Sequence, residues 1–333
     1  MLRLFRNNQF YTAILVFIYA LPFFISKFVN DDFLKVENAV DYTFLLAWVP
    51  NFKSLGTVAD SVLLFGILLI QAFWLNRLIN VNRLGKRATY YGSVAFLLCA
   101  FSFQGSDILS PALFANLSIT ISLVQLFRAY EKKSSVAEIF NAAFFASLGA
   151  LLNPAAIWYL PFIVISWFIL RAFNAKELII ILLGLTIPYY LLGTYMFAFG
   201  NLSLWWSNDV IGSFGRMAFN VNVNPSFWIS LGSWALLLLI SILNLNTLKQ
   251  KTTIREQKYI DVLFWLLIFS GLCWIGQKNY ATSDFITFAL PLSIFISLNL
   301  QSFKNDRFAE LLHFLLLSAA IFAQYQSYFY QGI

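Results

Sequence analysis

Charged residues are scarce in this sequence of 333 residues, because they make up 11% of the chain whereas 60% of it is hydrophobic. Soluble domains carry about 25% charged residues, so this composition excludes a soluble globular protein. Apolar runs of about 16 to 23 residues recur along the chain, and a helix of about 20 apolar residues crosses a bilayer. The sequence therefore predicts an all-α polytopic membrane protein with a single transmembrane domain over residues 1–333.

Cysteine and histidine are also rare. Cys99 and Cys273 both lie inside apolar runs, where neither is placed like a disulfide in a loop, and no Cys-x-x-Cys pair indicates redox chemistry. The one histidine, His313, has no cysteine or carboxylate at ligand spacing. We therefore expect neither zinc nor haem.

A cleavage site is missing from the first segment. Arg3 and Arg6 lead into an apolar run that ends at Lys27, without the small residues at which signal peptides are cut. This pattern predicts an uncleaved first membrane span.

The apolar runs predict eleven transmembrane helices, with boundaries set by charged, Gly, Pro or Asn residues. They are expected near residues 10–27, 57–76, 88–104, 108–127, 136–152, 155–170, 178–199, 226–247, 260–276, 285–300 and 309–328.

Basic residues predict how these helices face. Of the 22 Lys and Arg residues, 17 fall in the N-terminal segment and in the connections on its side, and 5 fall on the other side. Because cytoplasmic loops accumulate Lys and Arg, we expect the N-terminus to lie inside and the C-terminus outside. The pI of 9.3 then reflects topology, and needs no nucleic-acid partner to explain it.

Two long outer loops are expected, over residues 28–56 and 200–225. The first carries Asp31 and Asp32 at its start, followed by an amphipathic stretch predicted to lie along the membrane surface over 33–52. The two carboxylates have two interpretations. They cap that surface helix, or they supply a general base or a divalent-cation ligand for a lipid-borne substrate.

Other polar and aromatic residues are expected at the same face. The second outer loop carries Trp205, Trp206, Asp209 and Arg216, and a later segment carries Lys278 and Tyr280, followed by Asp284. Trp faces suit sugar rings and Arg suits phosphate, although paired Trp residues also anchor helices at membrane interfaces.

Taken together, these features resemble the GT-C class of glycosyltransferases. Asp31-Asp32 after the first span is similar to the acidic motif of that class's first outer loop. The stretch Gly149-Ala150-Leu151-Leu152-Asn153-Pro154 resembles a turn of the protein-mannosyltransferase-like branch, in which Lys or Arg is common where Asn153 stands. Lys278-Asn279-Tyr280 running on to Leu290-Pro291 resembles a late basic-Tyr-to-Pro pattern. In its Phe- and Asn-rich texture the chain is also similar to multi-spanning proteins of Bacteroidota.

The resemblance implies a multi-pass enzyme of the bacterial cytoplasmic (inner) membrane that takes a sugar from a polyprenyl-phosphate carrier at the outer face. Asp31 or Asp32 would act on the acceptor, Arg216 and Lys278 would bind the carrier phosphate, and Trp205, Trp206, Asp209 and Tyr280 would contact the substrate. Two alternatives stay open. One is a non-catalytic subunit of an envelope complex, in contact with membrane lipids and other subunits. The other is a transporter or flippase, which the scarcity of ionisable residues at mid-membrane positions disfavours.

Overall fold

The computed structural model describes most of the chain. The described residues are 1–29, 57–103, 109–132, 134–212, 218–219, 225–250, 252–274, 279–280, 282–303 and 305–330. The predicted surface helix over 33–52 and the carboxylates Asp31 and Asp32 lie outside them.

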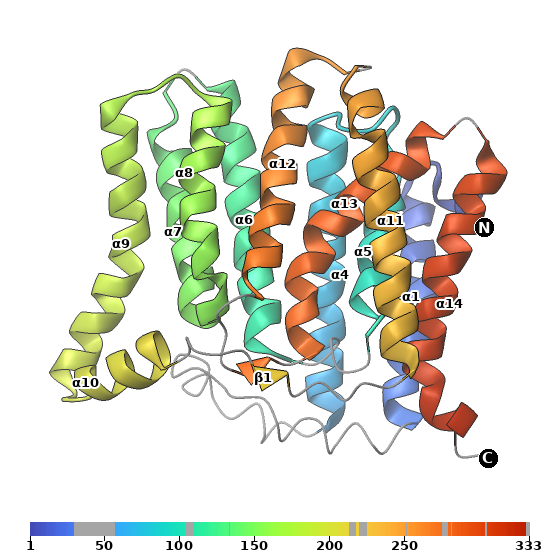
Figure 1. Ribbon diagram of the computed structural model, residues 1–333, viewed down its shortest axis with the longest axis horizontal. Helices are drawn as coiled ribbons and strands as arrows, with labels where there is room; N and C mark the ends of the chain where they lie inside the picture. The colour runs from blue at the N-terminus through green and yellow to red at the C-terminus, as the bar shows by residue number, and fades with distance from the viewer. Residues whose placement is uncertain are drawn as a thin grey trace.

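The described residues are almost entirely helical (Figure 1). The long helices are α1 (Phe10–Val29), α4 (Thr57–Val81), α5 (Tyr91–Ala100), α6 (Pro111–Glu131), α7 (Val136–Leu152), α8 (Tyr159–Leu170), α9 (Ala175–Ala198), α11 (Pro225–Lys249), α12 (Ile254–Leu272), α13 (Ile286–Ser302) and α14 (Asp306–Tyr330). Short elements are η1 (Leu2–Phe5), η4 (Pro154–Trp158), α10 (Leu202–Trp205), the π-helix η5 (Trp206–Ile211), η6 (Thr282–Phe285), β1 (Ala218–Phe219) and β2 (Asn279–Tyr280). Each of the eleven predicted segments thus contains a helix.

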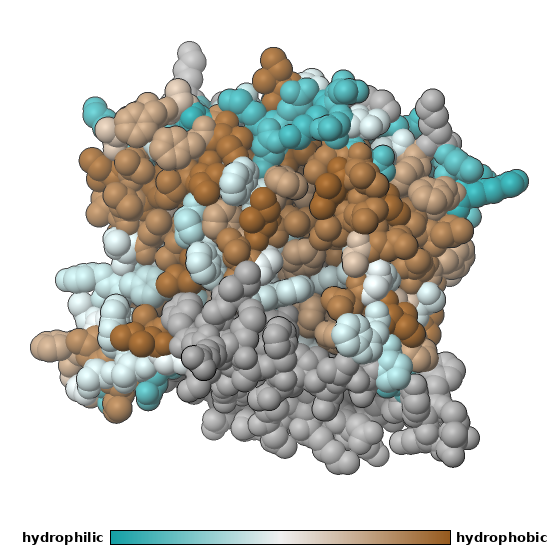
Figure 2. Space-filling view, viewed as in Figure 1, coloured by the Kyte–Doolittle hydropathy of each residue, from teal (hydrophilic) through white to brown (hydrophobic). Residues whose placement is uncertain are grey.

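Successive helices run in alternate directions, so their connections gather at two ends of the bundle (Figure 1). Every Lys and Arg whose side chain the structure describes lies in a connection at one of these ends or in the adjoining turns of a helix, and we name this the basic end. Figure 2 shows the hydrophilic residues gathered there above a broad apolar belt. The N-terminus lies toward the basic end and the last described helix finishes at the other, which we name the opposite end (Figure 1).

Six of the helices are long and apolar enough to cross a membrane. They are α4, α6, α9, α11, α13 with the preceding η6, and α14. Their outward faces expose large apolar side chains, among them Leu183 on α9 and Leu243 on α11, and a bilayer would cover such faces. The described part of the chain is therefore that of a multi-pass membrane protein.

The bundle is built around α13, in which most side chains are buried. It packs against α5, α6, α11 and α12. At the edge formed by α7 and α9, small residues let the helices approach closely: a Cβ added at Gly184 would lie 2.7 Å from Ala143 Cβ and 2.9 Å from the carbonyl oxygen of Phe140. Small residues at helix contacts are typical of membrane bundles.

The segment predicted over 88–104 forms a helix of only 10 residues, α5, which is buried along its whole length. Ten residues rise about 15 Å, half of the hydrocarbon thickness of a bilayer. The chain continues as non-helical backbone through Phe101, Ser102 and Phe103, all buried. Two side chains from distant helices bond to this backbone: Gln324 Nε2 donates to Phe101 O at 3.1 Å, and Ser230 Oγ donates to Ser102 O. Irregular backbone inside a membrane is tolerated where protein groups satisfy it in this way.

The segment predicted over 260–276 begins earlier than expected. The helix α12 starts at Ile254, because Thr253 and Glu256 form a capping box in which each side chain accepts a hydrogen bond from the other residue's backbone N–H. The first turns of α12 are therefore polar, and the apolar run marks only the later part of this helix.

Candidate functional site

The second predicted outer loop begins where α9 ends. Gly200 has φ of 71°, a conformation that favours glycine, and it turns the chain out of α9 into α10 and η5. Both short helices lie at the opposite end of the bundle (Figure 1). Trp205, Trp206 and Asp209 are thus placed at that end.

The two tryptophans of this loop have different surroundings. Trp205 is buried against Leu151 and Met196, whereas Trp206 is 50% exposed, and their ring centroids are 6.1 Å apart. Trp205 therefore fixes the loop to α7 and α9. Trp206 is the ring that has an open face for a ligand, and Asp209 follows it in η5 with a half-buried side chain.

A short parallel strand pair joins the second outer loop to the segment after α12. Ala218 pairs with Asn279 and Phe219 pairs with Tyr280. Two of the predicted clusters therefore meet at the opposite end, although they are 61 residues apart in sequence, measured from Ala218 to Asn279. The backbone of Tyr280 takes part in this pair. Arg216 and Lys278, like Asp31 and Asp32, lie outside the described residues.

Asp284 is a carboxylate that the sequence interpretation did not select as a site residue. It lies in η6, a few residues after β2, and is only 7% exposed. The hydroxyl of Thr287 donates to its backbone carbonyl at 2.7 Å, which joins η6 to α13. A buried carboxylate next to a membrane helix is costly and often functional. The signal in the sequence was its position between a polar segment and an apolar run.

An aromatic cluster surrounds Phe285, the residue that follows Asp284. The Phe285 ring stacks on Phe103 with centroids 4.2 Å apart and meets Trp274 edge-on at 4.6 Å. Trp234 meets Phe103 edge-on at 4.8 Å, and its indole Nε1 is buried without a hydrogen-bond partner among the described residues. This packing holds the start of α13, and with it Asp284, in a fixed place.

The turn that resembles the protein-mannosyltransferase-like branch has a structural role here. Asn153 is 3% exposed, and its Oδ1 accepts a hydrogen bond from the backbone N–H of Ala155 at 3.2 Å, which caps η4. Gly149 lies at a close contact, since an added Cβ would be 3.3 Å from the carbonyl oxygen of Ala115. The side chain of Asn153 therefore serves as the N-cap of η4.

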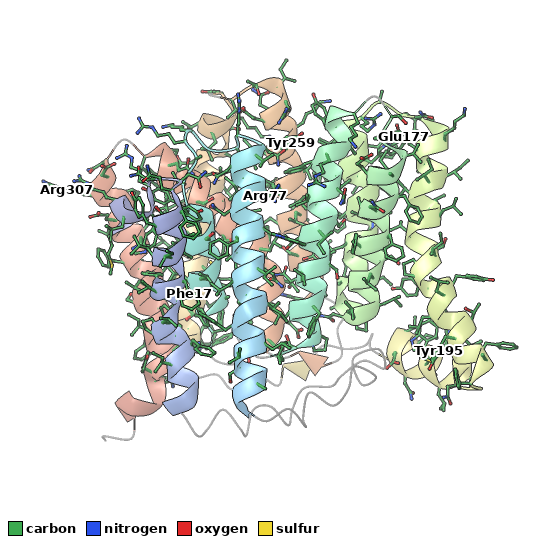
Figure 3. All side chains as sticks on the ribbon, turned by 180° about the vertical axis from the view of Figure 1, so that it is seen from behind. Phe17, Arg77, Glu177, Tyr195, Tyr259 and Arg307 are labelled. Carbon is green, nitrogen blue, oxygen red and sulfur yellow. The ribbon has the colours of Figure 1, made fainter. Side chains whose placement is uncertain are left out.

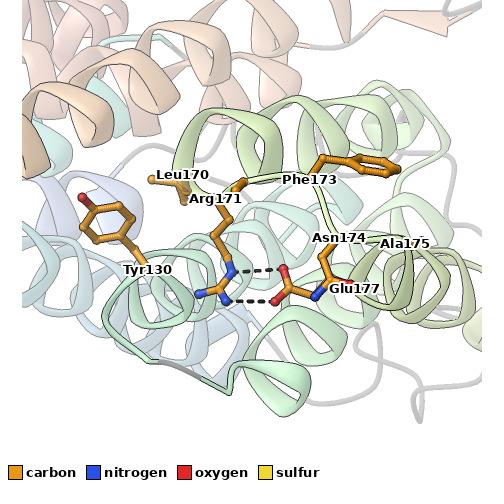
Figure 4. Close-up of a pocket in the computed structure, with 8 residues that line it drawn as sticks. Tyr130, Leu170, Arg171, Phe173, Asn174, Ala175 and Glu177 are labelled. Atoms are coloured by element: carbon orange, nitrogen blue, oxygen red, sulfur yellow. Dashed lines mark hydrogen bonds and ion pairs between the residues drawn. The ribbon is translucent and has the colours of Figure 1, made fainter.

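The basic end holds a surface pocket of about 560 Å³ at the connection between α8 and α9 (Figure 4). Arg171 forms one side of it. Its guanidinium donates to both carboxylate oxygens of Glu177, at 3.0 Å and 2.9 Å, and also to the carbonyls of Ala129 and Lys132 at 2.7 Å and 2.9 Å. Arg171 therefore ties the end of α6 to the start of α9.

The carboxylate of Glu177 is similarly engaged. Besides Arg171, it accepts a hydrogen bond from Trp167 Nε1 at 2.8 Å, and the hydroxyl of Ser135 lies 3.5 Å away. Because Glu177 is 7% exposed, these partners compensate for its loss of water. This pair could not be recognised from the sequence, in which Arg171 is one of the 17 basic residues that indicate topology.

No group of three or more His, Cys, Asp or Glu side chains at metal-binding separation occurs among the described residues. In comparisons with known proteins, no family model, no curated protein and no solved structure matches this chain.

Proposed function

We propose that this protein is a GT-C-like membrane glycosyltransferase of the bacterial cytoplasmic membrane. Its substrate would be a sugar linked to polyprenyl phosphate, and its site would lie at the opposite end of the bundle, facing outward. It is supported by Trp206 and Asp209, which follow α9, and by the strand pair that joins this loop to the segment of Tyr280.

The observation that supports the proposal most is the pairing of β1 with β2. Arg216 precedes Ala218 by two residues, and Lys278 directly precedes Asn279. The strand pair therefore joins the two segments of sequence that carry these basic residues. Arg and Lys side chains bind phosphate through charge-assisted hydrogen bonds, so we propose that both act on the carrier phosphate.

The proposed chemistry is a glycosyl transfer. In glycosyl transfer the acceptor oxygen forms a bond to the anomeric carbon, the bond from that carbon to the carrier phosphate breaks, and the acceptor proton passes to a base. Asp31 or Asp32 would take the proton or hold a divalent cation, and Arg216 and Lys278 would stabilise the negative charge on the departing phosphate. Trp206, Asp209 and Tyr280 would contact the sugar.

The test is complementation with charge-removing variants. Cells that lack the native gene would receive Asp31→Asn and Asp32→Asn, singly and together, and their glycan profile would be compared with wild type. Asn still caps a helix, so folding and membrane insertion should persist, whereas loss of a general base lowers the rate by about 10² to 10⁴ fold. Arg216→Ala and Lys278→Ala should each weaken carrier binding by about 1.5 to 3 kcal/mol.

Asn153→Ser is a suitable control, because serine also caps a helix and the residue is already engaged in the protein. Its glycan profile should equal wild type. A wild-type profile from the double Asn variant would reject the enzyme, and the chain would then be better explained as a non-catalytic subunit of an envelope complex.

A further inference from the structure

The pocket at the basic end lies between the ends of α6 and α8 and the start of α9 (Figure 4). Tyr130 stands on one side, Arg171 and Asn174 on the other, and Ala172 and Phe173 lie in the exposed connection between them. The proposed glycosyl-transfer site is at the other end of the bundle, so this pocket needs an explanation of its own.

The charges around the pocket do not cancel. Arg171 and Glu177 neutralise each other, but Lys258 stands beside the pocket and forms no ion pair among the residues that the structure describes. Its Nζ lies 5.3 Å from the centre of the Tyr130 ring and 3.4 Å from the carbonyl oxygen of Leu170, both of which line the pocket. Lys258 therefore contributes a positive charge without a paired carboxylate, and one of the three N–H donors of its ammonium group is used by Leu170.

Arg171 adds to the positive wall but has little left to donate. Four of its five N–H groups are used by Glu177 and by the carbonyls of Ala129 and Lys132. Lys258, at the edge of the pocket, is therefore the charged side chain with N–H groups still available to an anion, and the Glu177 carboxylate would not repel that anion strongly because Arg171 neutralises it.

The outer rim of the pocket is apolar. Phe173 is 64% exposed and stacks on Phe168, which is 52% exposed, with ring centroids 6.2 Å apart. On α9, which begins at the pocket, Ile179 is 58% exposed and Leu182 is 50% exposed. A cationic recess that adjoins exposed aromatic and aliphatic side chains suits an amphiphilic anion better than a soluble one.

We propose that this pocket binds the phosphate headgroup of an anionic phospholipid. Lys258 contacts the phosphate, the Arg171–Glu177 pair holds the shape of the recess, and Phe168 and Phe173 lie against the glycerol and the first part of the acyl chains. A soluble phosphate compound shares the headgroup chemistry but lacks the apolar part.

The test measures lipid retention by the full-length protein in detergent, using native mass spectrometry with added phosphatidylglycerol or phosphatidylcholine. Wild type should retain phosphatidylglycerol in preference to phosphatidylcholine. Lys258→Gln should weaken retention about tenfold, since a charge-assisted hydrogen bond to phosphate is lost, and Lys258→Arg should keep it. Ala172→Trp should weaken it equally, because the indole fills the recess while every charge stays.

Arg307→Gln is the matched control, because it removes one positive charge from the same end. Arg307 is exposed and lies at the far edge of that end from Glu177 (Figure 3). Retention should stay within about twofold of wild type. Lipid binding unchanged in both Lys258→Gln and Ala172→Trp would overturn the proposal. So would competition by glycerol phosphate at the same concentration as the lipid, since it would identify a soluble phosphate as the ligand.

Discussion

The hydroxyl of Tyr19 lies 3.0 Å from Nε2 of His313, and this hydrogen bond joins α1 to α14. The two residues are 294 positions apart, so the contact closes the bundle between its first and last long helices. His313 is 1% exposed, and its Nδ1 has no hydrogen-bond partner among the described residues. The Tyr19 bond is therefore its principal polar contact.

Removal of that bond should destabilise the protein. Tyr19→Phe leaves Nε2 of a buried histidine unsatisfied, which costs about 1 to 3 kcal/mol. Adding His313→Leu removes the unsatisfied polar group. The loss of stability in the double variant should therefore be smaller than the sum of the losses in the two single variants. Thermal unfolding in detergent measures each. Tyr11→Phe is the control on the same helix, since Tyr11 is 47% exposed and should change stability by less than about 0.5 kcal/mol.

The Arg171–Glu177 pair should be a major support of the α6–α9 contact. Glu177→Leu leaves the guanidinium of Arg171 without its carboxylate in a mostly buried place, and loss of one member of a buried pair costs about 3 to 5 kcal/mol. Asp261→Asn is the comparison, because its pair with Lys249 is 42% and 34% exposed and should contribute less than about 1 kcal/mol. Equal effects on the unfolding temperature would show that the buried pair contributes no more to stability than the exposed one.

The end of α5 should depend on α14. Gln324→Leu leaves the carbonyl of Phe101 without its donor inside the bundle, at a cost of about 1 to 3 kcal/mol. Ser318→Ala, also on α14, removes a hydroxyl that bonds only to its own helix at Leu315 and should be nearly neutral. Guanidinium or thermal unfolding of the two variants compares them directly.

The orientation of the two ends is tested by labelling. Because Lys and Arg divide 17 to 5 between the two sides, a cysteine at Ser54 or Ser213 should react with an impermeant reagent on intact cells, and one at Ser134 should not. Ser134 is exposed at the basic end, and both native cysteines are buried, so they should stay silent. Labelling of Ser134→Cys from outside would reverse the assignment.

The helices could be predicted from the sequence because membrane insertion demands long apolar runs, and each of the eleven runs holds a helix. Hydropathy alone was less informative about where α12 starts, since Thr253 and Glu256 extend that helix through polar residues. It also overestimated α5, because its last turn gives way to backbone that Ser230 and Gln324 satisfy from other helices. Such tertiary substitutes leave no local pattern.

The candidate site followed the same division. The placement of Trp205, Trp206 and Asp209 at the opposite end could be predicted from the alternation of connections. The burial of Trp205 and of Asp284 could not, because both depend on contacts between helices that are distant in sequence. The pairing of β1 with β2 likewise has only two residues on each side, too few for a strand pattern to be recognised.

The hydrogen bonds from Gln324 and Ser230 to the backbone that follows α5 have a consequence for membrane insertion during synthesis. The two side chains that bond to Phe101 and Ser102 lie 223 and 128 residues further along the chain. While α5 is entering the membrane, neither donor has yet been synthesised. Until then these carbonyls must accept hydrogen bonds from water or from the insertion machinery. The end of α5 can therefore reach its final packing only after α14 has entered the membrane. A nascent chain that stops before α14 should remain bound to its insertion factors longer than one that includes α14.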